Sequence, residues 1–220
     1  MTSPSRITPE RAVLMGALLA ALAYLPDIRY DFILDDYPLI LMNETIASWR
    51  NWKMAFTTHI FAVKNAIEPP EFGALHYRPV YKLWQMLNEH LFGYVFPWWH
   101  LTSLLLHFGV ILLVYRLAIK VVKERWTAAL AALLFAFHPI HVESVAYVSA
   151  STDLLVTLFA LISFLAYLQF REGSASPLYF IASVFAAALA MMSKETAVMF
   201  PWLLFAYEAL REAQIGRAHV

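Results

Sequence analysis

The chain consists of long apolar runs interrupted by one charged stretch. A helix that crosses a bilayer needs about 17–25 mostly apolar residues. Leu101–Val122 and Leu154–Phe170 are the clearest runs of this kind, and Arg116 and Lys120 lie near one end of the first, where long side chains can reach the interface. Shorter apolar runs occupy Ala12–Leu25, Trp126–Phe137, Pro177–Met192 and Ala197–Ala209. The pattern predicts an all-α polytopic membrane protein with about six transmembrane helices.

Charge is concentrated between the first two predicted spans. The segment Pro26–Trp99 carries fourteen formal charges, eight acids and six bases, whereas residues 126–170 carry two, Glu143 and Asp153. We therefore interpret Pro26–Trp99 as a large water-facing loop.

Two stretches of this loop have apolar residues at helical spacing, Ile46–Phe56 and Tyr81–Phe92. We expect them to form helices that lie along the membrane surface. Tryptophan side chains favour the membrane–water interface, so we expect an interfacial belt of Trp49, Trp52, Trp84, Trp98 and Trp99.

Basic residues in the short loops set the orientation, because such loops are richer in Lys and Arg on the cytoplasmic side. With six crossings, one side collects Arg6, Arg11, Lys120, Lys123, Arg125, Arg171 and Arg211. The chain then divides into a cytoplasmic tail (1–11), a first span (12–25), an extracytoplasmic loop (26–99), a bundle of about five helices (100–210) and an end segment (211–220). The polar residues expected on the outer side are Asp35, Asp36, Tyr77, Arg78, His138, His141, Glu143, Asp153, Lys194 and Glu195.

Both ends of the chain allow a second interpretation. The first apolar run, with Ala21-Leu22-Ala23 at its end, also resembles a cleavable signal peptide, and either reading leaves residue 26 on the outer side. The last six residues, Ile215–Val220, read like the translation of a sequencing adapter. We expect the natural protein to continue beyond Glu212 and the 220-residue chain to be inactive alone. The alternative is a genuine polar tail.

Composition narrows the class further. Hydrophobic residues make up 61% of the 220 residues and charged residues 15%, against about 45–50% and about 25% in an ordinary soluble domain. An aromatic content of 15% excludes a disordered chain, and a net charge of zero argues against nucleic acid as a partner. The chain has no cysteine, which excludes a disulfide framework and a thiolate metal site. An integral membrane protein remains.

Asp35-Asp36 is the first candidate for chemistry. These two carboxylates follow the first span by a few residues. A partly desolvated carboxylate has a raised pKa and becomes a better base. Neighbouring side chains point in different directions, so one can face a substrate while the other orients it or binds a cation. The alternative is a solvated acidic turn.

His138-Pro139-Ile140-His141-Val142-Glu143 is the second candidate. Its proline ends an apolar helix at the bilayer boundary. The two histidines and the glutamate could ligate a divalent metal, or the histidines could donate hydrogen bonds to an anionic group. A simple helix cap is the bland alternative, and ionisable groups so close to apolar spans favour function.

Further along, cationic side chains that suit a phosphate are Arg78, in His76-Tyr77-Arg78-Pro79, and Lys194. Lys194-Glu195 is alternatively a neutralised ion pair at a helix boundary. Asp153 begins a span and is alternatively an acid at a helix N-terminus. His107, in mid-span, is expected to be a buried histidine with its hydrogen bonds satisfied.

These segments, in this order, resemble a known family, and His138–Val145 is the most specific of them. The chain resembles the N-terminal membrane half of the transmembrane and tetratricopeptide-repeat-containing O-mannosyltransferases and their bacterial relatives, over about residues 10–210. The resemblance implies a partial C-type glycosyltransferase fold whose repeat domain this chain lacks. Family members usually carry an Arg near Ser151, and this chain has none there.

The resemblance also implies a function. A sugar, with mannose the expected one, would pass from a polyprenyl- or dolichyl-phosphate donor to a hydroxyl of a protein or glycan on the extracytoplasmic face. Asp35 or Asp36 would be the base, and the anomeric centre would invert. Tyr77, Arg78, His138, His141, Glu143, Asp153, Lys194 and Glu195 would contact the donor phosphate or substrate. No cofactor is required by this scheme, although a divalent metal would be compatible with it. The expected membrane is a bacterial inner membrane, or alternatively the endoplasmic reticulum.

Three other functional classes stay open at this point. A transporter would place ionisable groups near the bilayer midplane, and a membrane scaffold would tolerate the loss of both aspartates. A metal-dependent membrane hydrolase would rest on His138, His141 and Glu143 alone.

Overall fold

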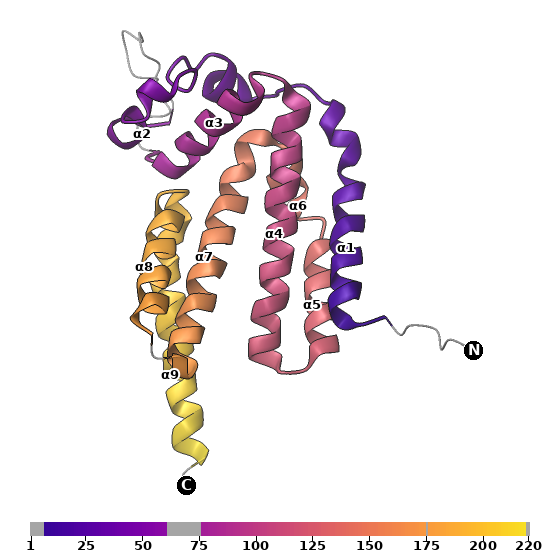
Figure 1. Ribbon diagram of the computed structural model, residues 1–220, viewed down its shortest axis with the longest axis vertical. Helices are drawn as coiled ribbons and strands as arrows, with labels where there is room; N and C mark the ends of the chain where they lie inside the picture. The colour runs from indigo at the N-terminus through magenta and orange to yellow at the C-terminus, as the bar shows by residue number, and fades with distance from the viewer. Residues whose placement is uncertain (1–6, 61–75, 175, 219–220) are drawn as a thin grey trace, which may run out of the picture.

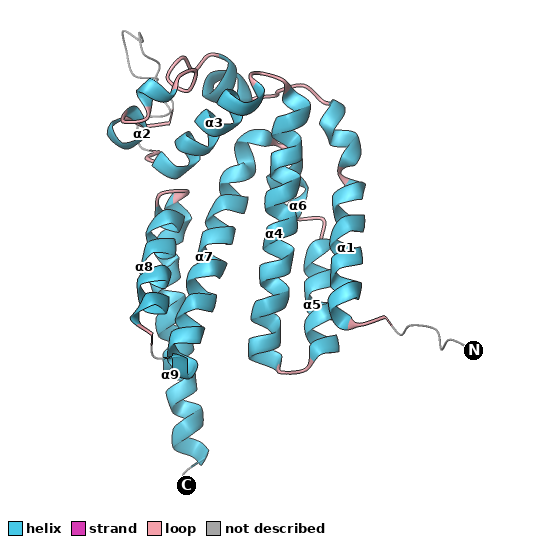
Figure 2. Ribbon diagram, in the orientation of Figure 1, coloured by secondary structure: helices cyan, strands magenta, loops and turns pink. Residues whose placement is uncertain are grey.

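The computed structural model describes residues 7–60, 76–174 and 176–218. Within these ranges the chain forms helices and loops and no β-strand (Figure 2). The prediction of an all-α protein is therefore confirmed.

The molecule has two parts, a bundle of long helices and a cap of short ones (Figure 1). Chain direction alternates along the bundle, so the start of the first helix and the end of the last lie opposite the cap. The bundle helices are α1 (Pro9–Ala23), α4 (Phe96–Val122), α5 (Arg125–Ala136), α7 (Ser151–Gln169), α8 (Pro177–Met191) and α9 (Phe200–Ala218).

Local sequence explains where these helices begin and end. The Thr8 side chain accepts a hydrogen bond from the backbone N–H of Arg11 at the start of α1, and Pro9 occupies the first helical position. The Glu124 carboxylate caps α5 by accepting from the N–H groups of Trp126 and Thr127. Lys123 adopts a left-handed conformation, φ 61°, which ends α4 and allows the tight reversal into α5.

Three segments are long and apolar enough to cross a membrane, Pro9–Arg29, Phe96–Val122 and Val148–Glu172. Two further apolar helices, α5 and α8, are shorter. The structure thus supports a membrane protein, while the count of six crossings stays a prediction.

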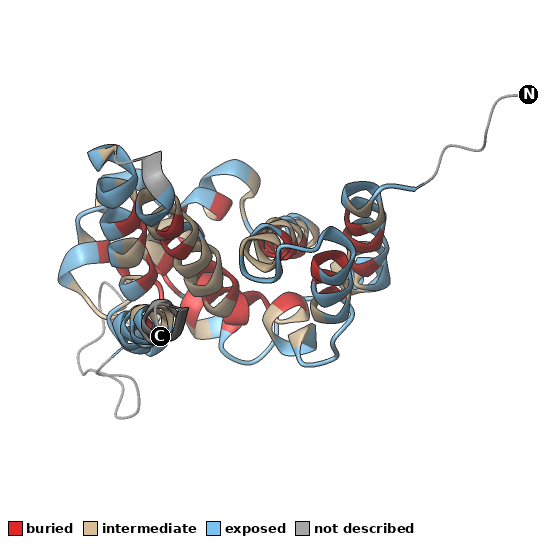
Figure 3. Cartoon of the chain, turned by 90° about the horizontal axis from the view of Figure 1, so that it is seen from below, coloured by how far each residue is buried: buried red, intermediate tan, exposed pale blue. Residues whose placement is uncertain are grey.

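Helix packing in the bundle relies on small residues. Ala17 of α1 and Ala128 and Ala132 of α5 are fully buried where α1, α4 and α5 meet. Between α7 and α8, each of Ser163 and Ser183 donates its hydroxyl to the other's backbone carbonyl, at 2.8 and 2.9 Å. Small and hydroxyl side chains allow close approach of helices in lipid. Buried positions accordingly lie where helices face one another, and exposed ones lie on the outside (Figure 3).

The cap is built mainly from the predicted loop. It contains η1 (Leu25–Arg29), η2 (Tyr37–Leu41), η3 (Trp49–Asn51), α2 (Met54–Thr57) and α3 (Pro79–Phe92). Its core cluster includes Phe32, Ile40, Tyr81 and Met86, all at most 2% exposed. The remaining elements are α6 (His141–Ala146) and η4 (Val148–Ala150), which lead into α7, η5 (Phe170–Ser174), which follows it, and η6 (Glu195–Met199), between α8 and α9.

Two expectations about the loop need correction. Ile46–Phe56 is not one helix but the separate short elements η3 and α2, because Ser48 is extended and its side chain accepts from the N–H of Arg50, which starts a new turn. Trp99 is not in an exposed belt. It is 1% exposed, packs edge-on against Phe32 and donates its indole N–H to the carbonyl of Gly93.

Candidate active site

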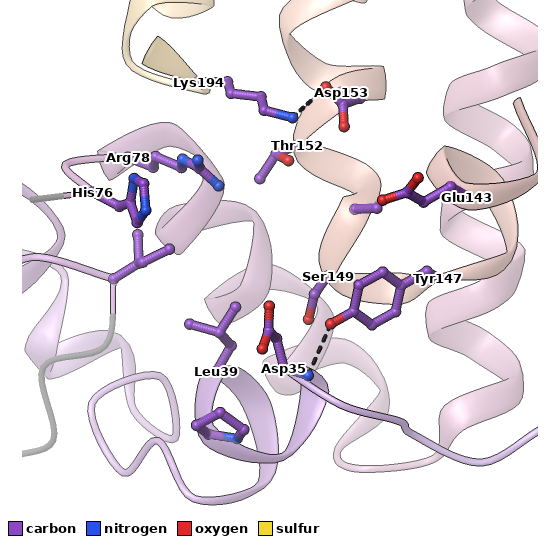
Figure 4. Close-up of a pocket in the computed structure, with 13 residues that line it drawn as sticks. Asp35, Leu39, His76, Arg78, Glu143, Tyr147, Ser149, Thr152, Asp153 and Lys194 are labelled. Atoms are coloured by element: carbon purple, nitrogen blue, oxygen red, sulfur yellow. Dashed lines mark hydrogen bonds and ion pairs between the residues drawn. The ribbon is translucent and has the colours of Figure 1, made fainter. Parts of the chain in front are cut away.

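A cavity of about 600 Å³ opens where the cap meets the first turn of α7 (Figure 4). The loop after α1, the start of α3, the α6–α7 connection and the α8–α9 turn all contribute to it. Its lining residues are Asp35, Pro38, Leu39, Ile60, His76, Arg78, Glu143, Tyr147, Ser149, Ala150, Thr152, Asp153 and Lys194. Segments more than 150 residues apart in the sequence therefore share one polar site.

Asp35 is exposed and lines the cavity. Its backbone N–H donates to the phenolic oxygen of Tyr147 at 2.8 Å, a contact drawn in Figure 4. Burial raises the pKa of Tyr147 to about 12, so the phenol stays protonated at neutral pH. Tyr147 thus ties the loop that carries Asp35 to the α6–α7 connection without introducing a charge.

Asp36 has the opposite environment, because only 1% of it is exposed. Its Oδ1 accepts from the backbone N–H of Ser149 at 2.8 Å and from the Ser149 hydroxyl, and its Oδ2 accepts from the N–H of Ile33 at 3.0 Å. Burial raises the pKa of Asp36, and the hydrogen bonds from Ser149 and Ile33 oppose that rise. Three donors therefore hold the Asp36 carboxylate, and Asp36 is not among the residues that line the cavity.

Lys194 and Asp153 form an ion pair on the cavity wall, with Nζ 2.6 Å from Oδ1. Lys194 reaches this position because α8 has ended and its backbone is extended between α8 and η6. The backbone N–H of Val80, in α3, donates to the carbonyl of Met192 at 3.0 Å and ties the cap to this turn.

Arg78 supplies the second cation and is paired with Glu195. Its Nε lies 3.1 and 3.0 Å from the two carboxylate oxygens, and its Nη2 lies 2.8 Å from Oε2. His76 lies 3.3 Å from the same carboxylate. Burial alone would raise the pKa of Glu195, but Arg78 outweighs it and holds the pKa below its usual value. The described contacts of Arg78 do not use Nη1.

Five of the ten predicted site residues line the cavity together: Asp35, Arg78, Glu143, Asp153 and Lys194. Two more, Asp36 and Glu195, lie directly behind lining residues through the contacts above. The structure thus brings seven of the ten residues together around one cavity, and their functional roles stay predictions.

Three predicted residues lie outside the cavity. The Tyr77 hydroxyl donates to the carbonyl of Phe56 at 3.1 Å. His138 is exposed, and its Nδ1 accepts from the N–H of Ile140 at 3.2 Å, as in a helix cap. The His141 ring packs against Phe135 and against His107, with ring centres 4.3 and 5.2 Å away.

His107 differs from its expected state. It is 1% exposed, as predicted for a core histidine, but neither ring nitrogen has a hydrogen-bond partner among the described residues. The expectation of satisfied hydrogen bonds finds no support among the described side chains, where the ring neighbours of His107 are Tyr24, Phe135 and His141.

A metal centre would need three or more converging ligands. No group of three His, Cys, Asp or Glu side chains in the described part of the chain is arranged to hold a metal. His138, His141 and Glu143 lie within six residues of one another but form no such group. The His138 and His141 ring centres are 6.2 Å apart, and Glu143 lines the cavity.

Sequence reasoning missed Tyr147, Ser149 and Thr152 as site residues. The only sequence signal for Ser149 and Thr152 is the run of small and polar residues Ser149-Ala150-Ser151-Thr152 at the start of a span. This run is buried, and the backbone of η4 within it lies close to Asp36.

Comparison with known proteins identifies the family of the chain. Residues 77–215 match the family described as dolichyl-phosphate-mannose-protein mannosyltransferase. Relatives include protein O-mannosyl-transferase TMTC1 of Mus musculus (30% identity over 89% of this chain and 22% of the relative). Protein O-mannosyl-transferase Tmtc2 of Drosophila melanogaster has 32% identity over 82% of this chain and 20% of the relative. TMTC4 of Homo sapiens has 29% identity over 89% of this chain and 29% of the relative.

The chain thus spans less than a third of the length of these relatives. No solved structure matches it. The family model covers well over half of the chain, including Arg78, Glu143, Asp153, Lys194 and the bundle after α1 as far as residue 215. The chain belongs to the dolichyl-phosphate-mannose-protein mannosyltransferase family.

Proposed function

We propose that the protein transfers a sugar, mannose, from a polyprenyl-phosphate donor to a hydroxyl group of a protein at the extracytoplasmic membrane surface. Family membership supports a mannosyltransferase. The observation that carries the proposal is the pairing, in one cavity at the end of the helix bundle, of an exposed carboxylate with two cations.

The cations suit the phosphate of the donor. Arg78 and Lys194 line the cavity near the first turn of α7. Each is paired with a carboxylate, Glu195 or Asp153, which holds the side chain in position before substrate arrives. Preorganised positive charge stabilises the negative charge that develops on a leaving phosphate.

Between the two aspartates, Asp35 is the better base. It is exposed to the cavity, whereas the oxygens of Asp36 already accept hydrogen bonds from Ser149 and Ile33. A base must reach the proton that it removes. We assign Asp36 to positioning, because it ties the Asp35 loop to the start of α7.

The reaction follows from these roles. The acceptor oxygen forms a bond to the anomeric carbon as the bond from that carbon to the phosphate oxygen breaks. The acceptor proton passes to the Asp35 carboxylate, and the bonding electron pair leaves with the phosphate. Attack from the face opposite the phosphate inverts the anomeric centre. The leaving group is already a stable anion, so one base suffices, unlike the acid and base pair of glycoside hydrolysis.

The test is sugar transfer by the full-length protein in detergent, with radiolabelled polyprenyl-phosphate mannose and a Ser/Thr peptide. Wild type is compared with Asp35→Asn and with Glu44→Gln, a control because Glu44 is exposed and outside the cavity. We expect transfer by wild type and the control, loss in Asp35→Asn, and a product of opposite anomeric configuration to the donor. Full transfer by Asp35→Asn would remove the proposed base, and a retained configuration would remove the single displacement.

A further inference from the structure

A second cavity of about 480 Å³ lies directly beside the first. Glu143 and Tyr147 line both cavities, so these two side chains form a shared wall. The other walls of the second cavity come from η1 and the loop that follows it, from the start of α4 and from α6.

The two cavities differ in charge. The first is lined by three carboxylates, those of Asp35, Glu143 and Asp153, and also by the two cations Arg78 and Lys194. Among the described residues that line the second are three carboxylates, those of Asp27, Asp31 and Glu143, and no Lys or Arg. A phosphate would be repelled here, whereas a cationic or neutral ligand would not.

His100 adds an observation that is independent of the acids. It lines the second cavity, is 4% exposed and has its Nε2 3.1 Å from the carbonyl oxygen of Tyr30. A carbonyl can only accept, so Nε2 carries the hydrogen and Nδ1 of the neutral ring is a bare acceptor. This Nδ1 is buried and has no partner among the described residues. A buried acceptor of this kind is normally satisfied, which points to a ligand that donates a hydrogen bond.

The proposed base Asp35 and the positioning residue Asp36 lie at the boundary between the cavities. Asp36 bonds Ile33, which lines the second cavity, and Ser149, which lines the first. Asp35 is bonded through its N–H to Tyr147 of the shared wall. A base at this boundary can reach an acceptor on one side and a sugar on the other.

We propose that the second cavity binds the acceptor, as a peptide segment that carries a basic side chain next to its reactive Ser or Thr. The proposal rests on the proposed transferase function and names the acceptor class for that site. The basic side chain pairs with Asp27 and Asp31, a peptide N–H donates to Nδ1 of His100, and the hydroxyl faces Asp35 across the shared wall.

Equilibrium binding tests this without requiring turnover. Fluorescently labelled Ser/Thr peptides flanked by Lys or by Glu are titrated with full-length protein in detergent, and binding of polyprenyl-phosphate mannose is measured in parallel. The variants are Asp27→Asn and Asp31→Asn, with Glu44→Gln as the matched control. Two separate variants are used so that the test still stands if one of them fails to fold.

We expect wild type to bind the Lys-flanked peptide more tightly than the Glu-flanked one. Each Asp variant should weaken the Lys-flanked peptide by about fivefold, as for a partly exposed ion pair, and leave the Glu-flanked peptide and the donor unchanged. Equal binding of both peptides to wild type, or weakened donor binding in the Asp variants, would overturn the assignment. Selective peptide binding without any sugar transfer would instead overturn the proposed function and leave the cavity assigned.

Discussion

The cap and the bundle bury different kinds of side chain. The cap buries polar side chains, Asp36, Asn43, Lys82 and Gln85, each with a specific partner. The bundle around α1, α4 and α5 buries mainly alanine and aliphatic residues that need only the right size. A buried polar group left without its partner costs about 1–3 kcal/mol, so replacing one of these buried cap residues should change stability. A change in the bundle should alter stability alone.

Asp35→Asn should give the largest effect. Removing the base should lower kcat by about 10²-fold or more, since a positioned general base contributes about 10²–10⁴-fold. The side chain is exposed and its described hydrogen bond is made by its backbone, so thermal unfolding should not change. Asp36→Asn should instead lower stability. The amide that replaces the carboxylate has only one oxygen, so it cannot accept hydrogen bonds as the two Asp36 oxygens do from Ile33 and Ser149, and the variant should unfold at a lower temperature. A variant pair with equal stability and equal kcat would contradict this division of roles.

Replacing Lys194 tests the cavity cations. Lys194→Met should raise the KM for the lipid-phosphate donor by about tenfold, the worth of one charge-assisted hydrogen bond. Asp153→Asn frees Lys194 from its partner and should leave donor KM unchanged or lower it. Lys53→Met, at an exposed cap position outside the cavity, is the control. If Lys194→Met and Asp153→Asn raised the donor KM equally, Lys194 would have a structural role only.

Ala132→Leu should destabilise the packing of the bundle without changing the site in the cap. Ala132 is 0% exposed on α5, and inserting a larger side chain there should destabilise the protein by about 1–3 kcal/mol. Ala131→Leu, at the neighbouring exposed position, should have little effect. Thermal unfolding in detergent measures both, and donor and acceptor KM should be those of wild type. A kinetic change in Ala132→Leu would show that the two regions are coupled.

Lys82 offers the smallest effect, and it depends on pH. The side chain is 1% exposed, its Nζ donates to the Thr58 hydroxyl at 2.9 Å, and burial lowers its pKa from 10.5 to about 8. Between these two values the unfolded chain binds more protons than the native protein, so wild-type stability rises with pH across that window.

Lys82→Met removes the buried charge and should stabilise the protein by about 1–2 kcal/mol below pH 8, offset in part by the lost hydrogen bond. The difference from wild type should shrink as pH rises toward 10.5. Unfolding at pH 7 and pH 10 measures this, with exposed Lys53→Met as the reference. A difference that did not vary with pH would mean that Lys82 is not buried as a cation.

Several features could be predicted from the sequence because they depend on neighbouring residues. Apolar runs set the helices α4, α7 and α8 to within a few residues, since length and hydropathy are local properties. The charges in the loop predicted that one end of the molecule is polar, and the different directions of adjacent side chains predicted different surroundings for Asp35 and Asp36. Helix caps such as Thr8 and Glu124 act over three residues and are visible in the sequence.

Other features were decided by the tertiary structure, because they join residues more than 100 positions apart. The bonds from Ser149 to Asp36, from Asp35 to Tyr147 and from Arg78 to Glu195 determine which carboxylate is exposed and which cation is held. Nothing in the local pattern distinguishes Asp35 from Asp36, or places Trp99 in the core and His138 outside the cavity. The sequence by itself determined an all-helical membrane chain with a polar end. Packing of the cap on α7 decided the site, since burial and hydrogen bonding depend on which distant segments meet.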